Sequence, residues 1–246
     1  MTDAAWHSEG EDRQGPWVVT CDHATNRVPP EFGPLGLPED EMQRHIAWDI
    51  GALGVARALG DLLDAPVVWS DFSRLVIDPN RGPDDPTLLM KLYDGTIIPG
   101  NRHADADEIA RRRAALYDPY HEAVARVLRD RTEAALVSVH SFTPQLRNRP
   151  PRPWQVGILS AHDRRLADPL LDSLGAEPDL CIGDNEPYAG HLPGDAVDRH
   201  ALATGRLNVL LELRQDLIAT ADGQRHWAER LAPHLARALA DVTGET

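Results

Sequence analysis

Three apolar stretches of the chain each lead into a side chain that can bind a metal ion or move a proton. VVTCDH ends at His23, ALVSVH ends at His140, and NVLLEL contains Glu212. If these stretches are parallel strands, their carboxyl ends meet at one edge of a sheet, which is where α/β proteins bind ligands. Imidazole is a favoured zinc ligand, a catalytic zinc ion keeps one position open for water, and a nearby carboxylate can accept the proton of that water. The pattern therefore makes metal-assisted hydrolysis one interpretation of these residues.

The same three residues also have a purely structural interpretation. A single histidine at a strand end is more often a hydrogen-bonded surface residue than a metal ligand, and a glutamate there usually pairs with a cation. Spacing alone leaves the catalytic and the structural interpretation open.

The composition indicates a folded, acidic protein with one domain. The 246 residues are 42% apolar and carry a formal charge of −14. Because phosphate contacts need a basic surface, this charge argues against a nucleic-acid partner. No apolar run reaches the roughly 18 to 20 residues that span a bilayer, and the N-terminus is too polar for a signal peptide, so we expect no membrane partner and a cytoplasmic location. We expect residues 1–15 to form a flexible tail and residues 16–246 to form a single domain.

Apolar periodicity predicts strands that alternate with helices. Strands are expected over residues 16–21, 65–70, 73–80, 134–141, 154–160, 178–183 and 206–214. Helices are expected over residues 39–63 (one helix or two), 105–131, 162–174 (with a proline break) and 223–239. Residues 80–103 are rich in Pro and Asp and should form a long surface loop, a feature that is usually functional. The alternation predicts a mostly parallel sheet that is covered on both faces.

Short motifs along the chain resemble those of a known enzyme family. In order, they are CDHATNRVP, WDIGA, SRLVIDPNR, YDPYH, VHSF, GDNEPYAG and ELRQDLI. This combination resembles the N-formylglutamate amidohydrolase family over about residues 17–240. That family is related in fold to zinc carboxypeptidases and aspartoacylase. The resemblance therefore implies an α/β fold with three α/β/α layers and a mostly parallel, mixed central sheet, of the zinc-carboxypeptidase-like (phosphorylase/hydrolase-like) kind.

The resemblance also implies roles for individual residues. His23 and His140 would ligate Zn2+ or another divalent metal, and Glu212 would be the general base. Asn80 and Arg81 would bind the substrate carboxylate or polarise its carbonyl. The family substrate is N-formyl-L-glutamate, a small N-acyl amino acid of histidine degradation, which is cleaved to formate and glutamate.

One position departs from the pattern of the related carboxypeptidases. They carry a glutamate ligand three residues after the first histidine, where this chain has Asn26. An amide oxygen brings no charge to offset a dication, so it is a poorer ligand than a carboxylate. The third ligand can therefore be Asn26, Asp49 of the WDIGA motif, or Asp22. The departure also leaves the identity of the metal open.

Further polar residues are candidates for substrate contacts. The planar fork of an arginine matches both oxygens of a carboxylate, and Arg81 is the first candidate, followed by Arg74 and Arg214. Tyr188 lies in a Gly- and Pro-bounded loop, where it either donates to the reacting oxygen as part of a lid or simply packs. Ser141 is a further candidate for substrate binding.

The sequence leaves three functions open. The first is metal-dependent hydrolysis of N-formyl-L-glutamate or a similar N-acyl amino acid. The second is a deacylase or peptidase that acts on a different N-acyl amino acid or a small peptide. The third is a non-catalytic binding or regulatory protein on the same scaffold, which Asn26 suggests. The oligomeric state is not predicted.

Overall fold

The computed structural model describes residues 4–244. Residues 1–3 of the expected tail and residues 245–246 of the expected domain lie outside the described residues. Over the described part, seven strands form one sheet in the order β1-β3-β2-β6-β9-β7-β8. Their bounds are β1 Trp6–Glu9, β2 Trp17–Cys21, β3 Val67–Ser70, β6 Ala135–Phe142, β7 Val156–Leu159, β8 Ile182–Asp184 and β9 Asn208–Arg214.

The sheet is mixed and mostly parallel, as expected. β3, β2, β6 and β9 run parallel to one another. β1 and β7 run antiparallel to their neighbours β3 and β9, and β8 runs parallel to β7. β2 and β6 are buried along their whole lengths. Because both faces of these strands are covered, their sequences need no alternation of apolar and polar residues.

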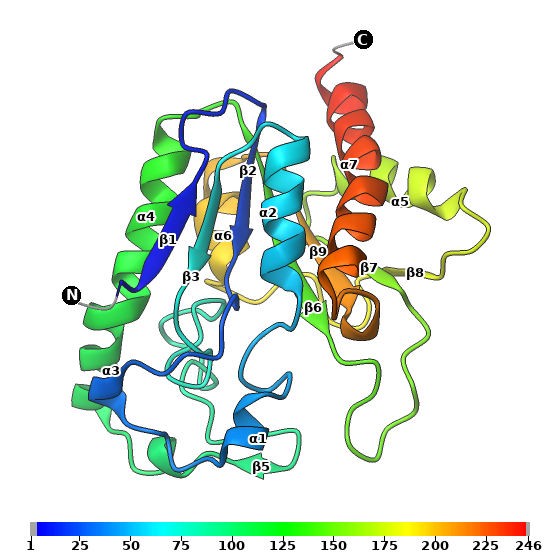
Figure 1. Cartoon of the computed structure of the whole chain (residues 1–246). Coiled ribbons are helices and arrows are strands. Elements are labelled where there is room, and N and C mark those ends of the chain that lie inside the picture. Colours follow the sequence, from blue (N-terminus) through cyan, green and yellow to red (C-terminus); the bar gives the residue numbers. More distant parts are fainter. Residues whose placement is uncertain (1–3, 245–246) are drawn as a thin grey trace.

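Helices cover both faces of the sheet (Figure 1). They are α1 Glu39–Met42, α2 Ala52–Leu62, α3 Ala106–Arg112, α4 Asp118–Arg129, α5 Ala167–Gly175, α6 Ala196–His200 and α7 Ala221–Thr243, with short turns η1 Pro30–Phe32, η2 Pro99–Asn101, η3 Arg113–Tyr117, η4 Leu202–Thr204 and η5 Gln215–Leu217. α2, α5 and α7 pack on one face, and α4 and α6 pack on the other. Val19 of β2 packs in the core on the side of α2, α5 and α7, and its neighbour Val18 packs in the core on the side of α4 and α6. Successive side chains of a strand point to opposite faces, so β2 contributes to both cores. The three-layer architecture is confirmed.

Residues 6–9 of the expected flexible tail form β1, which pairs with β3. The sequence WHSE does not signal a strand, because an edge strand is exposed along one side and needs few apolar residues. Glu9 at its end accepts hydrogen bonds from Arg57 of α2 at 2.9 and 3.0 Å.

Residues 73–80 do not form the expected strand but a series of turns, although the whole segment is buried. The Ser73 hydroxyl and the Arg74 backbone N–H both donate to the carbonyl of Ala47, at 2.8 and 3.2 Å. The backbone groups are therefore satisfied without a neighbouring strand. A short apolar run cannot by itself distinguish a buried turn from a buried strand.

Residues 80–103 form the expected surface excursion, with one short hairpin inside it. Its strands are β4 Leu92–Tyr93 and β5 Thr96–Ile97, which pair antiparallel. The buried amide of Asn101 donates to the carbonyls of Leu75 and Met90, at 2.8 and 2.7 Å. These two hydrogen bonds fix the end of the excursion to its middle at Met90 and to the buried segment that precedes it at Leu75.

Two helices depart from the expected bounds at prolines. The predicted helix over 105–131 contains a π-helical turn, η3, before Pro119, whose nitrogen has no hydrogen to donate to the preceding turn. The predicted proline break in the helix over 162–174 does not occur, because α5 starts at Ala167 and Pro169 lies in its first turn, where no intrahelical acceptor is required. Within residues 4–244, no helix combines the length and the apolar character needed to cross a membrane.

α2 begins directly after Gly51, which has a φ of +82°. A Cβ atom at this position would lie 2.2 Å from the carbonyl oxygen of Ile218. Glycine adopts positive φ without a steric penalty, and the neighbouring chain leaves no room for a side chain. Gly51 therefore sets the turn that leads from Asp49 into α2.

We expect Gly51→Ala to lower the free energy of unfolding by about 2–4 kcal/mol, because it adds both the strained φ and the backbone clash. Gly175→Ala is the matched control: no atom lies within 4 Å of its added Cβ, and Gly175 ends α5. That change should alter stability by less than about 1 kcal/mol. Urea unfolding measures both, and equal losses in the two variants would contradict the role given to Gly51.

α4 and α6 meet at a buried pair of histidines. His121 Nδ1 lies 2.8 Å from His200 Nε2, and the stacked ring centroids are 5.1 Å apart. Burial lowers the pKa of His121 to about 3 and that of His200 to about 4, and the charge of Arg199 acts in the same direction. Both rings are therefore neutral in the folded protein at neutral pH.

This pair should make the fold less stable in acid. Both histidines take up a proton near pH 6.5 in the unfolded chain but only near pH 3–4 in the folded protein. Their contribution to the free energy of unfolding is therefore complete above pH 6.5 and is lost as the pH falls below that value. Between pH 7 and 4.5 we expect a loss of about 2 kcal/mol for each histidine. Denaturant unfolding should show a correspondingly smaller loss in the double variant His121→Leu, His200→Leu. An unchanged pH dependence in that variant would contradict the assignment.

Candidate active site

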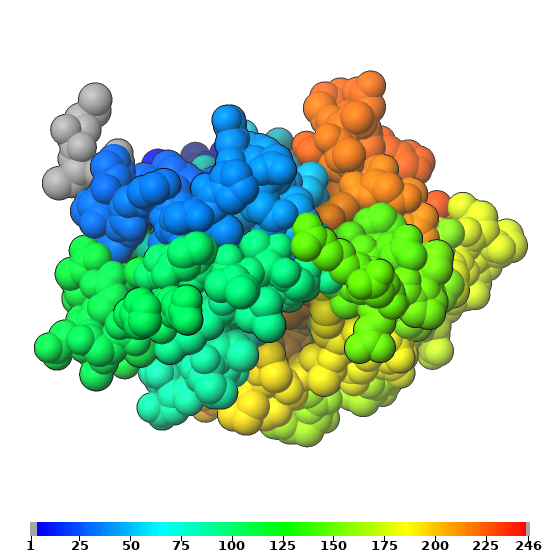
Figure 2. Space-filling view, turned by 90° about the horizontal axis from the view of Figure 1, so that it is seen from below, coloured from blue at the N-terminus to red at the C-terminus, as the bar shows by residue number. Residues whose placement is uncertain are grey.

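A cavity of about 380 Å³ opens at the carboxyl ends of β2, β6 and β9. The view from below in Figure 2 shows a hollow between segments near residues 90, 145 and 190, coloured teal-green, bright green and yellow. Polar side chains from distant parts of the chain line it: His23, Asp49, Asn80, Arg81, His140 and Glu212.

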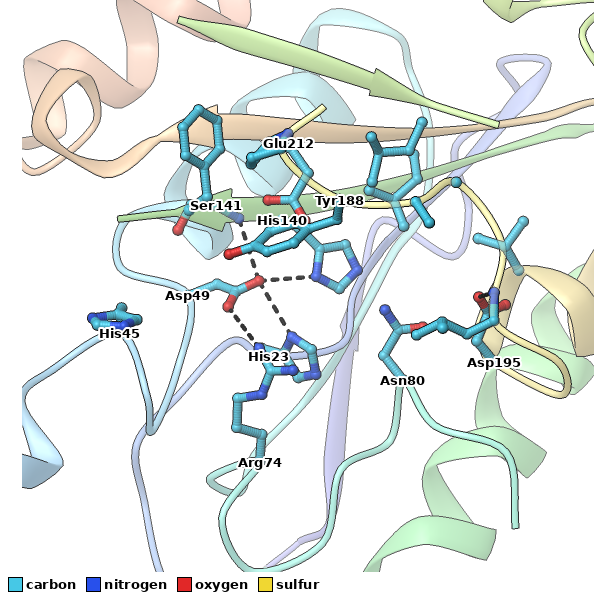
Figure 3. A pocket seen from close by; sticks show the side chains of 18 of the residues that line it. His23, His45, Asp49, Arg74, Asn80, His140, Ser141, Tyr188, Asp195 and Glu212 are labelled. Carbon is cyan, nitrogen blue, oxygen red and sulfur yellow. Dashed lines mark hydrogen bonds and ion pairs between the residues drawn. The ribbon is translucent and has the colours of Figure 1, made fainter. Parts of the chain in front are cut away.

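His23, Asp49 and His140 come together in this cavity (Figure 3). Asp49 Oδ2 lies 3.3 Å from His23 Nδ1 and 2.9 Å from His140 Nδ1. All three residues are buried, and one ligand atom from each lies within 4.8 Å of the others. Two imidazole nitrogens and a carboxylate are a common ligand set for catalytic zinc, with a further position open for water. This group can therefore hold a divalent metal ion.

The far nitrogen of each histidine contacts another carboxylate. His23 Nε2 lies 2.7 Å from Asp78 Oδ1, and His140 Nε2 lies 3.0 Å from Asp22 Oδ2. With its proton on Nε2, each ring donates to that carboxylate and presents the Nδ1 lone pair to the side of Asp49. Such pairs orient histidine ligands and raise their basicity.

The outer carboxylates are themselves held in place. Arg74 donates from Nε and Nη2 to Asp78 Oδ2, at 3.1 and 2.7 Å, and the Tyr120 hydroxyl donates to Asp22 Oδ1 at 2.5 Å. Burial opposes their ionisation, but Arg74 holds the pKa of Asp78 well below its usual range, and His140 lowers the pKa of Asp22 to about 2. Both groups are therefore ionised at neutral pH.

The buried cluster carries an excess of negative charge. Arg74 pairs with Asp49 and Asp78, and Asp22 contacts His140. Three buried carboxylates and one guanidinium leave a formal charge of −2 when both histidines are neutral. Buried charge that is not offset is costly. Protonation is one remedy: although burial opposes it, Asp22 and Asp49 raise the pKa of His140 well above its usual value. A bound dication is the other, so the charge balance and the donor set both fit a divalent metal.

Asp49, and not Asn26, lies at the centre of the group. The Asp49 backbone N–H donates to the carbonyl of His23 at 2.9 Å, and Asp49 Oδ2 accepts from the Ser141 backbone N–H at 3.2 Å. Asn26 does not line the cavity, and its Nδ2 donates to the carbonyl of Met42 at 2.9 Å. The expectation that Asn26 is a ligand is therefore not met, because the chain turns away from the cavity after His23.

Glu212 lies on β9, the neighbour of β6, beside the group formed by His23, Asp49 and His140, which we call the ligand group. The parallel register of β6 and β9 places it opposite His140. Glu212 is buried at the cavity wall, and its Oε2 has no hydrogen-bond partner among the described residues. Burial raises the pKa of this carboxyl above its ordinary value. A buried carboxyl group with an oxygen not engaged in a hydrogen bond can accept and return a proton.

Four of the five predicted substrate-binding residues line the cavity: Asn80, Arg81, Ser141 and Arg74. The Asn80 Oδ1 accepts from the backbone N–H of Ala196 at 3.2 Å, which leaves its amide N–H groups as donors. Arg81 donates to the carbonyl of Asn80 at 2.7 Å, and no carboxylate within residues 4–244 forms an ion pair with it. The Ser141 hydroxyl is engaged with the carbonyl of Ile50 at 3.0 Å.

The other two predicted arginines have carboxylate partners. Arg74 lines the cavity, but Asp49 and Asp78 occupy its guanidinium, so it supports the ligand group and is not available to a substrate. Arg214 does not line the cavity and was wrongly placed there, because β9 ends at this residue and the side chain pairs with Asp216 at 2.8 Å.

Tyr188 lines the cavity from the loop after β8 (Figure 3). Its hydroxyl accepts a hydrogen bond from Arg152 Nη1 at 3.0 Å, so its own proton can be donated elsewhere. Arg152 was not predicted, because nothing in the sequence distinguishes it from Arg149, the other arginine of the NRPPRPW loop. Asp78 was not predicted either, although an acid after an apolar run repeats the pattern seen at His23 and Glu212.

Comparison with known proteins identifies relatives of the whole chain. The family model described as N-formylglutamate amidohydrolase matches residues 15–219. The crystal structure of gene product Atu2144 from Agrobacterium tumefaciens is similar with a TM-score of 0.92 and 36% sequence identity, covering 98% of this chain and 97% of that chain. The crystal structure of N-formylglutamate amidohydrolase from Ralstonia eutropha JMP134 has a TM-score of 0.75 and 21% identity, covering 99% of this chain and 100% of that chain, and shares its fold. No curated protein matches the sequence.

The ligand group predicts which substitutions remove metal binding. Asp49→Asn and His140→Ala should each weaken Zn2+ binding by roughly 100-fold or more, because each removes one of three donors. Asn26→Ala is the matched control and should bind Zn2+ like the wild type, since its amide contacts Met42. Competition with a chelating dye and elemental mass spectrometry measure affinity and content. Wild-type affinity in Asp49→Asn, or its loss in Asn26→Ala, would contradict the ligand set.

Proposed function

The chain belongs to the N-formylglutamate amidohydrolase family, and from this membership we propose that it is a metal-dependent hydrolase of N-formyl-L-glutamate. The products would be formate and L-glutamate, a reaction of histidine degradation. The ion would be Zn2+, held by His23, Asp49 and His140. One observation carries the proposal: this ligand group shares a cavity with Glu212, a buried carboxyl whose Oε2 has no hydrogen-bond partner among the described residues.

The reaction needs one water molecule and one group that moves a proton. Zinc bound at this position would supply a Lewis acid that polarises the formyl carbonyl and lowers the pKa of water. Glu212 accepts a proton from the water while the water oxygen forms a bond to the formyl carbon. Glu212 then gives this proton to the nitrogen of glutamate as the C–N bond breaks, so the carboxylate is regenerated.

Residues on the cavity wall would hold the substrate in place. Arg81 offers a guanidinium with no carboxylate partner among the described residues, and Asn80 beside it offers amide N–H donors, so together they suit the α-carboxylate. The Tyr188 hydroxyl, whose oxygen is engaged by Arg152, can donate to the carbonyl oxygen as negative charge develops there.

A different N-acyl amino acid or a small peptide is the second candidate substrate. A cavity of about 380 Å³ falls in the range of sites for molecules larger than N-formylglutamate, so longer acyl groups belong in the substrate screen. The non-catalytic alternative was suggested by Asn26, which brings no carboxylate to the metal site. In our proposal Asp49 supplies this carboxylate, and Asn26 contacts Met42 instead, so the alternative has no feature in its favour.

We expect Glu212→Gln to lower kcat for N-formyl-L-glutamate by roughly 10²–10⁴-fold, because the amide cannot accept the proton of water. Zinc content should stay at the wild-type level, since Glu212 is not part of the ligand group. Formate release from metal-loaded protein is the measurement. A variant with near-wild-type kcat would remove Glu212 from the mechanism.

The substrate is tested separately by comparing N-formyl-, N-acetyl- and peptidyl-L-glutamate on the zinc-loaded wild type. We expect the highest kcat/KM with the formyl compound. A higher value with either of the others would replace the substrate but keep the chemistry. Binding without turnover of any of them would favour the non-catalytic alternative.

A further inference from the structure

Part of the cavity lining is apolar and has no role in the reaction proposed above. It consists of Leu159 of β7, Leu192 of the loop before α6, Val197 of α6 and Leu210 of β9. We call these four residues the apolar wall. Apolar surface in a cavity stabilises an apolar group of a ligand, because contact removes both from water.

Leu210 lies in the middle of the sheet and yet keeps exposed surface. Its neighbours in β9, Val209 and Leu211, are fully buried in the core on the side of α2, α5 and α7. Leu210 points to the opposite face, where it lines the cavity and is only partly buried. A large apolar side chain in a central strand is ordinarily covered. The uncovered part of Leu210 is therefore available to a ligand.

Strand geometry places half of the apolar wall next to Glu212. Leu210 and Glu212 are two residues apart in β9, so their side chains lie on the same face, roughly 7 Å apart along the strand. Leu159 is directly opposite Leu210 in the antiparallel pair of β7 and β9, so its side chain shares that face. A substrate whose amide lies at Glu212 can therefore reach both leucines.

Hydrogen bonds place the other half of the apolar wall beside the residues proposed to bind the α-carboxylate. Asn80 Oδ1 accepts from the backbone N–H of Ala196, the residue before Val197, at 3.2 Å. Asp195, which lies near Asn80 in Figure 3, accepts from the backbone N–H of Leu192 at 3.1 Å. The Cα atom of an amino acid lies between its carboxylate and its acylated nitrogen. The side chain on this Cα can therefore contact both halves of the apolar wall.

The apolar wall offers little to a second carboxylate. Within residues 4–244, the arginine and lysine side chains that line the cavity are those of Arg74 and Arg81, and Arg74 is paired with Asp49 and Asp78. Both oxygens of Asp195 accept backbone hydrogen bonds, so this group donates none. The methylenes of glutamate can contact the apolar wall, but its second carboxylate gains no arginine partner there.

We propose that the apolar wall binds the side chain of the substrate, so that the enzyme also hydrolyses N-formyl amino acids with an apolar side chain, such as that of methionine or leucine. This inference rests on the proposed function and extends its substrate class. The bonds that change are the same: the C–N bond breaks, and water supplies a hydroxyl group to formate and a hydrogen to the nitrogen. The other product is the free apolar amino acid.

The experiment compares kcat/KM for N-formyl-L-methionine and N-formylglycine, which share the formyl group and the α-carboxylate and differ in the side chain. The wild type should favour the methionine compound by roughly 10–10²-fold, as expected for burial of one apolar side chain. Leu210→Ala and Leu192→Ala should each lower this ratio by roughly 5–10-fold through lost activity on the methionine compound alone. Leu192 lies outside the sheet, so Leu192→Ala decides the matter if Leu210→Ala does not fold.

Leu207→Ala is the matched control. Leu207 directly precedes β9 and is partly buried like Leu210, but it packs against the core on the side of α2, α5 and α7 and does not line the cavity. This variant should keep the wild-type ratio. A wild-type ratio near one would overturn the proposal. So would an equal fall on both compounds in the folded variants of the apolar wall, or a changed ratio in Leu207→Ala.

Two further outcomes separate this inference from the proposed function. Turnover of N-formyl-L-glutamate without turnover of N-formyl-L-methionine would overturn the inference and leave the proposed function intact. If no formyl compound is hydrolysed, the proposed function fails, and calorimetry with the products L-methionine and glycine tests the apolar wall alone. Tighter binding of L-methionine that is weakened in Leu192→Ala would support the inference, whereas equal binding of the two products, or none, would overturn it.

Discussion

The position of one oxygen atom, Oδ2 of Asp49, determines how the rest of the site is built. It lies 3.3 Å from His23 Nδ1 and 2.9 Å from His140 Nδ1, so a carboxylate is buried between two rings that must be neutral to bind a metal. A buried carboxylate has to be offset or hydrogen-bonded. Arg74 at 3.4 Å and the Ser141 backbone N–H at 3.2 Å do this from the protein side. A divalent cation would do so from the cavity side.

This requirement explains why residues 73–80 do not form a strand. Arg74 contacts both Asp49 and Asp78, and Asp78 contacts His23. In a strand, residues four apart are separated by about 13 Å, which is too far for a side-chain contact of this kind. Successive turns bring Arg74 Nη2 to 2.7 Å from Asp78 Oδ2. The apolar residues between them, Leu75, Val76 and Ile77, fill the core on the α4 side, and they give the segment its strand-like composition.

The sequence predicted the site where its chemistry follows regular structure. His23, His140 and Glu212 stand at the ends of β2, β6 and β9, which are neighbours in the sheet and run parallel, so strand pattern alone brought them together. Arg152 could not be predicted in this way, because its orientation comes from contacts with Phe142 and with residue 188, which lies 36 positions away. Edge strand β1 could not be predicted for a related reason. It is a strand because it pairs with β3, and its own composition does not indicate one.

The amide at position 26 shows why a ligand has to be judged in three dimensions. Along the sequence, Asn26 removes a carboxylate from the place where related carboxypeptidases have one, which suggests a weakened metal site. In the structure the carboxylate comes from Asp49, 26 residues after His23, and the hydrogen bond from its N–H to the carbonyl of His23 holds it beside the same histidine. The charge that a dication needs depends on where the carboxylate lies and not on which segment supplies it. Asn26 therefore gives no support to a non-catalytic role, and the charge balance around Asp49 fits a bound divalent cation.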